Sequence, residues 1–436
     1  MYVTLRGTPD TSGSDRRHST TQASGGKGKK VRRTVAPTVV GLGAVSLLTD
    51  ISSESVNAIL PIYITVVIGL GPLAYGFVDG IYQGVSALVR ILGGWWADRT
   101  DRPKWIALGG YGISAASRVV LLFSQAFWPI TGTIAMDRIG KGFRTGPRDA
   151  LIATASHPDF LGRNFGVHRT MDTTGALIGP LLAFAILAAF PFGLHGYQTV
   201  FVVSFAAAVM GVAVLGLIIP NLRRRPDTTS VVVPPSRPRL RDLAQPGLRR
   251  VLIVAGLLSV FTVGDGFLYL SLQAGGQITD RFFPLLFVGT NIAYLALAIP
   301  LGRLADRIGR GTVFLAGHVV LLAAYPMAAT HLGGMIGAVI VLLLLGTFYA
   351  ATDGVLAALA TREVPESVRA SGISAAQTVV AITRFASSVV FGLMWQFGNR
   401  ELALLVMTAG MVAAVPISAV LLRALAGRDR AQGTAT

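Results

Sequence analysis

Gly94-Trp95-Trp96-Ala97-Asp98-Arg99-Thr100-Asp101-Arg102-Pro103-Lys104 is a dense polar stretch between two long apolar runs, and it decides the fold because it recurs. Residues 302–310 read Gly-Arg-Leu-Ala-Asp-Arg-Ile-Gly-Arg, so the pattern G-x-x-A-D-R-x-x-R returns after 302 − 94 = 208 residues. An internal repeat fixes the architecture before any single residue is interpreted. Each copy lies between hydrophobic segments of membrane-spanning length, which predicts two halves of six spans each.

The composition is that of a membrane protein. The chain is 52% hydrophobic and only 14% charged, with a mean hydropathy of +0.61. A span needs roughly 20 apolar residues to cross about 30 Å of hydrocarbon, and 436 residues hold about a dozen such spans with short connections. We therefore expect an all-α integral membrane protein with about 12 transmembrane helices in two six-helix repeats. There is no cysteine, which excludes disulfides and thiolate metal sites.

The net charge of +17 is distributed unevenly along the chain. Basic residues gather before the first span, after the second, between the halves and at the end. The alternate connections at 69–72, 125–129, 190–197 and 330–334 carry no Lys or Arg. This asymmetry predicts a multi-pass protein of the cell (inner) membrane with both termini in the cytoplasm. The basic loops are explained by topology and anionic lipid headgroups, so we expect the lipid bilayer and no nucleic acid as a partner.

The domain organisation follows from composition. Residues 1–35 are rich in Ser, Thr, Gly, Lys and Arg and predict a disordered cytoplasmic tail. The spans of 36–220 form the first six-helix bundle. Residues 221–248 combine prolines with basic residues and predict a cytoplasmic linker. The second bundle takes 249–424, and 425–436 form a second cytoplasmic tail.

The repeated motif resembles the pattern G-x-L-A-D-R-x-G-R-[RK] that the major facilitator superfamily carries between spans 2 and 3. The resemblance covers nearly the whole chain outside the tails and implies the fold of that superfamily. It also implies a gating latch, in which Asp98 pairs with cations and a helix N-terminus and locks the halves in one state. The alternative is that these charges only set topology and loop geometry. The motif residues are Gly94, Asp98, Arg99 and Arg102 in the first copy, and Gly302, Asp306, Arg307 and Arg310 in the second.

Span 4 carries Asp137-Arg138-Ile139-Gly140-Lys141-Gly142, which resembles the superfamily pattern R-x-x-Q-G with Lys141 in the Gln position. A basic residue in mid-membrane costs about 2.5–3.5 kcal/mol, so both cations must face a polar cavity or acidic partners. Asp137 and Lys141 are one helical turn apart and could pair locally. The resemblance implies a role for Arg138 in proton coupling, and a purely structural ion pair remains the alternative.

Span 5 carries Gly175, Gly179 and Pro180, which resemble the G-x-x-x-G-P pattern of antiporters in the superfamily. The further glycines of that pattern are replaced by residues such as Leu181. Close packing of helices is the alternative explanation for the two glycines. Earlier in the same span, Asp172 lies at helical spacing from a histidine and an arginine, which predicts a polar cluster.

Span 1 carries Asp50 and Glu54, one turn apart near mid-membrane. They cannot face lipid, and two carboxylates so close should not both ionise easily, which suits one of them to proton exchange. The alternative is a satisfied ion-pair network joining spans 1, 4 and 5. In the second half, Asp265 and Arg384 face the cavity that the resemblance implies, or pair with each other.

Other chemistries are poorly represented. The chain lacks a nucleotide-binding phosphate loop, and its six histidines show no metal-binding spacing. We therefore expect no enzyme, no cofactor and no metal. The sequence predicts a monomeric secondary transporter, most simply a proton-coupled antiporter that exports a small molecule by alternating access, with Asp50 or Glu54 binding the proton. The alternatives are a symporter or facilitator that imports a metabolite or moves a lipid, and a transport-inactive membrane receptor.

Overall fold

Every regular element in the described part of the chain is a helix. The first half begins with α1 and ends with α6, and the connections between its helices are short. Prolines open α1 and α3 at the first turn, where a missing N–H costs nothing. The elements are α1 (Pro37–Ile62) with the π-turn η1 (Tyr63–Val67), α2 (Gly71–Thr100), α3 (Pro103–Leu122), α4 (Phe127–Ala155), η2 (Pro158–Phe160), α5 (Leu161–Ala189), and α6 (Leu194–Ala213) with η3 (Val214–Ile218).

The second half begins with a broken span. Its two parts are α7 (Pro246–Val260) and α8 (Asp265–Ala274), and Tyr325 bridges the gap. The Tyr325 hydroxyl donates to the Phe261 carbonyl at 2.8 Å and accepts from the Val263 N–H at 2.9 Å. The remaining elements are η5 (Asp280–Phe282), α9 (Phe283–Ile308), α10 (Arg310–Thr330), α11 (Gly334–Arg362), α12 (Arg369–Phe397) and α13 (Arg400–Gly433).

These boundaries come from a computed structural model that describes residues 35–100, 102–222, 245–276, 278–330, 334–365 and 368–433. The predicted N-terminal tail and most of the predicted linker lie outside these residues. Ten helical segments are long and apolar enough to cross a membrane. With α2 and α4, these make twelve, so the prediction of an all-α membrane fold with about 12 helices is confirmed. The helix α4 is less apolar because it carries Asp137, Arg138, Lys141, Arg144, Arg148 and Asp149.

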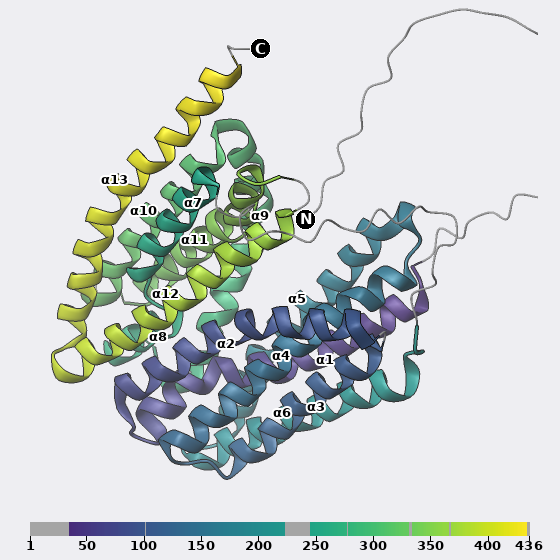
Figure 1. Cartoon of the computed structure of the whole chain (residues 1–436). Helices are drawn as coiled ribbons and strands as arrows, with labels where there is room; N and C mark the ends of the chain where they lie inside the picture. Colours follow the sequence, from purple (N-terminus) through teal and green to yellow (C-terminus); the bar gives the residue numbers. More distant parts are fainter. Residues whose placement is uncertain are drawn as a thin grey trace, which may run out of the picture.

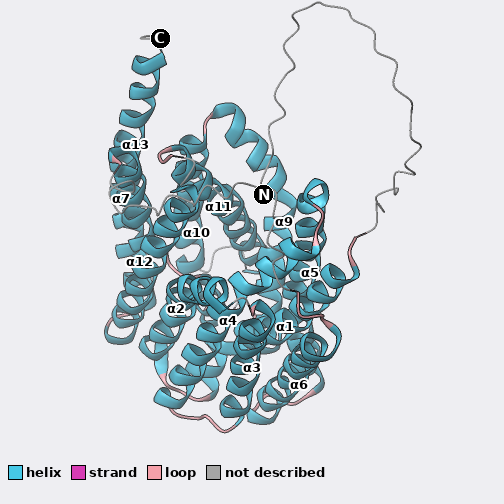
Figure 2. Ribbon diagram, turned by 45° about the vertical axis from the view of Figure 1, so that its right-hand side comes forward, coloured by secondary structure: helices cyan, strands magenta, loops and turns pink. Residues whose placement is uncertain are grey.

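The two halves form separate groups of helices (Figures 1 and 2). We call the end that holds the connections at 68–70, 123–126 and 398–399 the distal end, and the opposite end, where α1 begins and α13 finishes, the proximal end. Figure 1 shows the ribbons of the two halves close together distally and farther apart towards the proximal end. Side-chain contacts agree, since Phe184 of α5 stacks on Phe282 with ring centroids 5.7 Å apart, and Tyr75 of α2 meets Phe267 of α8 at 4.8 Å.

Glycines bring α1 and α5 into close contact. A Cβ atom built on Gly179 would lie 2.8 Å from the backbone nitrogen of Ser55, and one on Gly175 would overlap the backbone of Leu47. Real Cβ atoms essentially never approach closer than 3.0 Å, so neither position accepts a larger residue without movement of a helix. This packing holds the acidic residues of α1 against α5.

Candidate functional site

The Asp50 carboxyl group lies between α4 and α5. It is buried, and its Oδ1 atom is 3.9 Å from Nη2 of Arg144 on α4. The carboxyl group of Asp172 on α5 is an electrostatic neighbour of Asp50. Two neighbouring carboxylates repel each other when both are ionised, which favours a proton on one of the two groups. The structure thus pairs Asp50 with an acid from another helix.

Glu54 has partners of its own one turn further along α1. Its carboxylate accepts hydrogen bonds from the Tyr82 hydroxyl at 3.3 Å and from Nδ2 of Asn57 at 3.1 Å. Nζ of Lys141 lies 3.9 Å away, and both ionic side chains are partly exposed. Asp50 and Glu54 are thus neighbours on α1 with different partners. Asp50 lies beside Asp172 of α5 and Arg144 of α4, whereas Glu54 contacts α2 and Lys141 of α4.

Asp172 is the centre of a second set of polar contacts. Arg169 donates to its carboxylate at 3.1 Å, and Nη1 of Arg148 lies 3.7 Å away. Arg148 also donates to the Ser46 hydroxyl at 3.3 Å, and Nε2 of His168 is hydrogen-bonded to the same hydroxyl at 2.9 Å. The polar residues predicted in span 5 therefore join α4 and α1 in one network.

A buried triad of charges lies between α3 and α4 in the first half. Asp137 accepts a hydrogen bond from Nη2 of Arg118 at 2.8 Å and is paired with the neighbouring Arg138. The three side chains are only 1–3% exposed. Arg118 also donates to the hydroxyls of Ser52 at 3.3 Å and Ser53 at 3.2 Å. The triad therefore fastens α3 and α4 to α1 beside Asp50 and Glu54.

The local Asp137–Lys141 pair suggested by the sequence is not formed. Asp137 is satisfied by Arg118, which reaches across from α3, while Lys141 faces Glu54 of α1. Arg138 stacks over the ring of Tyr82 with its guanidinium carbon 3.9 Å from the ring centroid. Asp137 is therefore satisfied by its neighbour Arg138 on α4 and by Arg118 from α3, which leaves Lys141 to Glu54.

The second half holds fewer charges. Arg384 of α12 lies 5.9 Å from the ring centroids of both Phe348 and Tyr349. Its Nε atom is buried and has no hydrogen-bond partner among the described residues. Asp265 accepts a hydrogen bond from the Gly266 N–H at 3.2 Å. Within the described ranges, no ion pair of 4.0 Å or less joins Asp265 to Arg384, so the direct pairing considered from the sequence is not formed.

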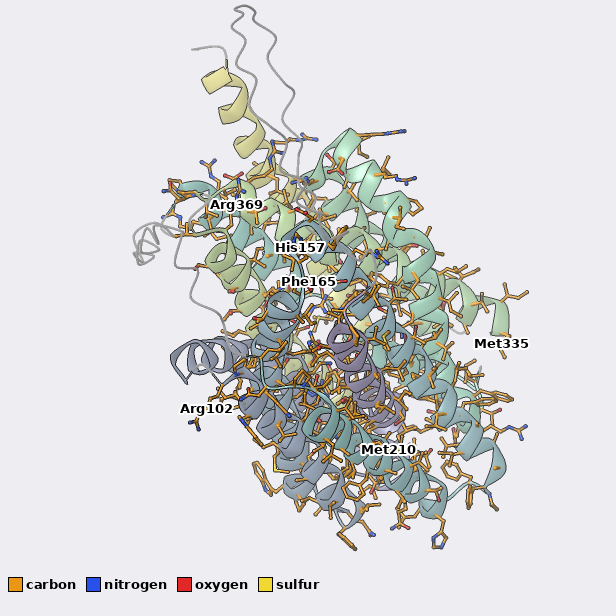
Figure 3. All side chains as sticks on the ribbon, turned by 90° about the vertical axis from the view of Figure 1, so that its right-hand side faces the viewer. Arg102, His157, Phe165, Met210, Met335 and Arg369 are labelled. Atoms are coloured by element: carbon orange, nitrogen blue, oxygen red, sulfur yellow. The ribbon has the colours of Figure 1, made fainter. Side chains whose placement is uncertain are left out.

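The repeated motif lies at the proximal ends of both halves. In the second copy, Nη2 of Arg310 pairs with Asp306 at 3.2 Å, and its Nη1 donates to the Ala358 carbonyl of α11 at 3.4 Å. Both contacts stay within the second half. Figure 3 shows Arg102 of the first copy pointing away from the bundle. Gly302 and the exposed Arg307 belong to α9. In the first copy, the structure does not describe the side chains of Asp98 and Arg99 or the surroundings of Gly94.

Three site residues were missed by the sequence interpretation. Arg118 in α3 and Asp79 in α2 are lone charges in apolar spans, the same signal that selected Asp50. Arg144 was passed over because it follows two other basic residues on α4. In the part of the chain that the structure describes, no group of three or more His, Asp and Glu residues is arranged to hold a metal ion.

Comparisons with known proteins are consistent with this architecture. Residues 42–275 match the sequence model of the Major Facilitator Superfamily. The chain is 27% identical over 369 residues to an uncharacterized MFS-type transporter of Methanocaldococcus jannaschii, covering 84% of this chain and 90% of the relative. Among solved structures, the nucleoside transporter NupG is similar with a TM-score of 0.73 at 14% identity, covering 88% of this chain and 99% of that one. A bacterial homolog of the human lysosomal transporter Spinster, inward-facing and unoccupied, has a TM-score of 0.68 at 14% identity, with 88% and 96% covered. At such identities the structural likeness shows the fold alone.

Proposed function

We propose that this chain, which belongs to the major facilitator superfamily, is a proton-coupled antiporter that exports a small molecule by alternating access. Membrane transport follows from the family, while proton coupling rests on one observation. Asp50 and Asp172 are neighbouring carboxyl groups on α1 and α5, and two carboxyl groups that share a site favour one bound proton. The pair lies in a span, where an ionisable residue is by default a functional candidate.

Loss of that proton would change the partner of Asp50. Two adjacent ionised carboxylates repel each other, so Asp50 would move away from Asp172. Arg144 is suited to receive the ionised Asp50, because it lies 3.9 Å away and its Nη1 atom has no hydrogen-bond partner in the described ranges. Asp172 would keep Arg169 and Arg148. The two protonation states therefore favour different placements of α1 against α4 and α5, which is what coupling requires.

The remaining site residues have supporting roles in this proposal. Glu54 and Lys141 form a partly exposed pair that would contact the substrate, and Asp265 and Arg384 would line the opposite wall of the transport cavity. Asp137 and Arg138 would hold the proton site in place. The paired motifs around Asp98 and Asp306 would bias the inward/outward equilibrium as gating latches. We place the proximal end and both termini in the cytoplasm, because the basic connections lie there.

Export is proposed from the resemblance of residues 175–180 to the antiporter pattern, and the direction can be tested directly. The substrate would first be found by comparing growth with and without the gene across a panel of drugs, siderophores and metabolites. Purified protein in liposomes would then be given a proton gradient of either sign. Antiport predicts that substrate moves against the direction of proton flow, whereas movement with the protons would establish the symporter instead.

The proton site itself is tested with Asp50→Asn in the same liposomes. We expect the variant to insert normally and to lose substrate-dependent proton flux, because the amide cannot exchange a proton. Asp159→Asn is the matched control, since that carboxylate is 77% exposed in the connection between α4 and α5. Undiminished proton flux in Asp50→Asn would reject Asp50 as the proton carrier.

A further inference from the structure

The distal contact between the halves is a close seam along α2 and α12. Gly76, Gly80 and Gly84 are spaced four residues apart and line one face of α2. A Cβ on Gly76 would lie 2.5 Å from the carbonyl oxygen of Ser388, and one on Gly80 would lie 2.7 Å from Cδ2 of Phe385. The glycines therefore let the backbones of the two halves nearly touch.

Asp79 lies beside this seam and is only 6% exposed. Its Oδ2 atom accepts a hydrogen bond of 2.5 Å from the Ser388 hydroxyl on α12. The side chains of Tyr75 and Gln83, on its own helix, are further polar neighbours of this carboxylate. The break between α7 and α8 closes over the carboxylate, since a Cβ on Gly264 would lie 2.8 Å from Oδ2. A carboxylate of the first half is thus held by two elements of the second.

The space around Asp79 is too small for a substrate. A cavity of about 10 Å³ remains between the halves, which is at most the room that one water molecule needs. The charged and titratable groups around Asp79 are Arg384 of α12, Asp265 of α8, Tyr349 of α11 and Tyr75 of α2. The cavity is lined by Asp79, Gln83, Thr262, Val263, Gly264, Tyr349, Arg384 and Ser388.

We propose that Asp79 is the positioning residue of the distal gate, and that its contacts with Ser388 and the Gly264 break hold this gate closed. Asp79 belongs to the first half, whereas Ser388, Gly264 and Arg384 belong to the second. Separation of the halves at the distal end removes all of these partners in one step and admits water in their place. The contacts therefore exist in one state of the transport cycle only, and this difference biases the equilibrium.

This proposal rests on alternating access and not on the identity of the proton carrier. It complements the latch that the sequence suggested at the proximal end. A hydrogen bond to a charged group contributes enough to shift an equilibrium about tenfold or more. Loss of the Asp79–Ser388 bond is therefore expected to raise the ratio of distally open to closed molecules by about tenfold.

The test measures the distal distance directly. The chain has no cysteine, so spin labels can be attached to Val66→Cys and Phe397→Cys, two exposed distal positions, one in each half. Pulsed electron paramagnetic resonance of the protein in liposomes gives the distribution of distances between the two labels, and no substrate is needed. We expect a new, longer distance in Asp79→Ala and Ser388→Ala, and a wild-type distribution in Ser388→Thr, which keeps the hydroxyl. Asp159→Ala is the control for loss of an exposed acid.

The outcomes separate a gate from a merely structural contact. A structural role predicts a lower melting temperature with an unchanged distance distribution in Asp79→Ala, and that result would overturn the proposal. Equal opening in Ser388→Thr and Ser388→Ala would overturn it as well, because the hydroxyl would then be irrelevant. If Asp79→Ala does not fold, the two Ser388 variants decide alone. Failure of proton coupling in the Asp50 experiment leaves all of these expectations unchanged.

Discussion

Replacement of Asp137 by asparagine distinguishes a proton carrier from a structural counter-ion. Asp137 is the carboxylate in contact with both Arg118 and Arg138. Asp137→Asn preserves the shape of the side chain but leaves two guanidinium groups, with side-chain exposures of 1% and 3%, without a contacting negative charge. Removing one partner of a buried ion pair costs about 3–5 kcal/mol. Since whole domains are stable by about 5–15 kcal/mol, this loss is a large fraction of the total.

The prediction is checked by thermal unfolding in detergent, followed through the fluorescence of the five tryptophans. We expect the melting temperature of Asp137→Asn to fall by about 3–5 °C, because an unfolding entropy of about 2.1 cal/mol/K per residue gives about 1 °C per kcal/mol for a chain of 436 residues. Adding Arg118→Gln removes one of the stranded charges. The double variant should therefore be more stable than the sum of the single losses predicts, with a coupling of about 0.5–3 kcal/mol.

The opposite result is equally informative. If Asp137→Asn melts within about 1 °C of the wild type, at the scale expected for exposed substitutions, the triad is not the structural element described above. If that variant also loses proton flux while Asp50→Asn retains it, Asp137 rather than Asp50 carries the proton. Asp159→Asn again provides the baseline for an exposed acid.

Two further predictions concern packing and the proximal motif. Gly175→Leu and Gly179→Leu should destabilise the fold by about 1–3 kcal/mol or more, because each new side chain overlaps the backbone of α1. Gly166→Leu is the control on the same helix. No atom lies within 4 Å of the added Cβ at this position, so the variant should melt like the wild type. Asp306→Asn should change the free energy of unfolding by less than about 1 kcal/mol, because its pair with Arg310 is 67% exposed on the acidic side. Melting of Gly175→Leu or Gly179→Leu at the temperature of Gly166→Leu would contradict the packing argument, and a large loss of stability in Asp306→Asn would contradict the second expectation.

Much of the fold is readable from the sequence, because span length and the 208-residue repeat are local or periodic signals. Lone charges in spans also identify most of the candidate site, because an ionisable side chain in the membrane is energetically costly and usually marks a functional position. The partner of each charged side chain cannot be predicted in the same way. Asp137 meets Arg118 because α4 packs against α3, and Asp50 lies beside Asp172 because α1 packs against α5. Sequence spacing measures neighbours along one helix and contains no measure of which helices touch.

The interruption in the seventh span has a mechanical consequence. Because α7 ends at Val260 and α8 begins at Asp265, no continuous backbone ladder joins them, and the freed groups of Phe261 and Val263 are satisfied by the phenol of Tyr325. Bending an intact helix would sacrifice backbone hydrogen bonds at the kink. A span that is already divided can bend between α7 and α8 without breaking helical hydrogen bonds. The tilt of α8 relative to α7 is therefore set mainly by side-chain contacts.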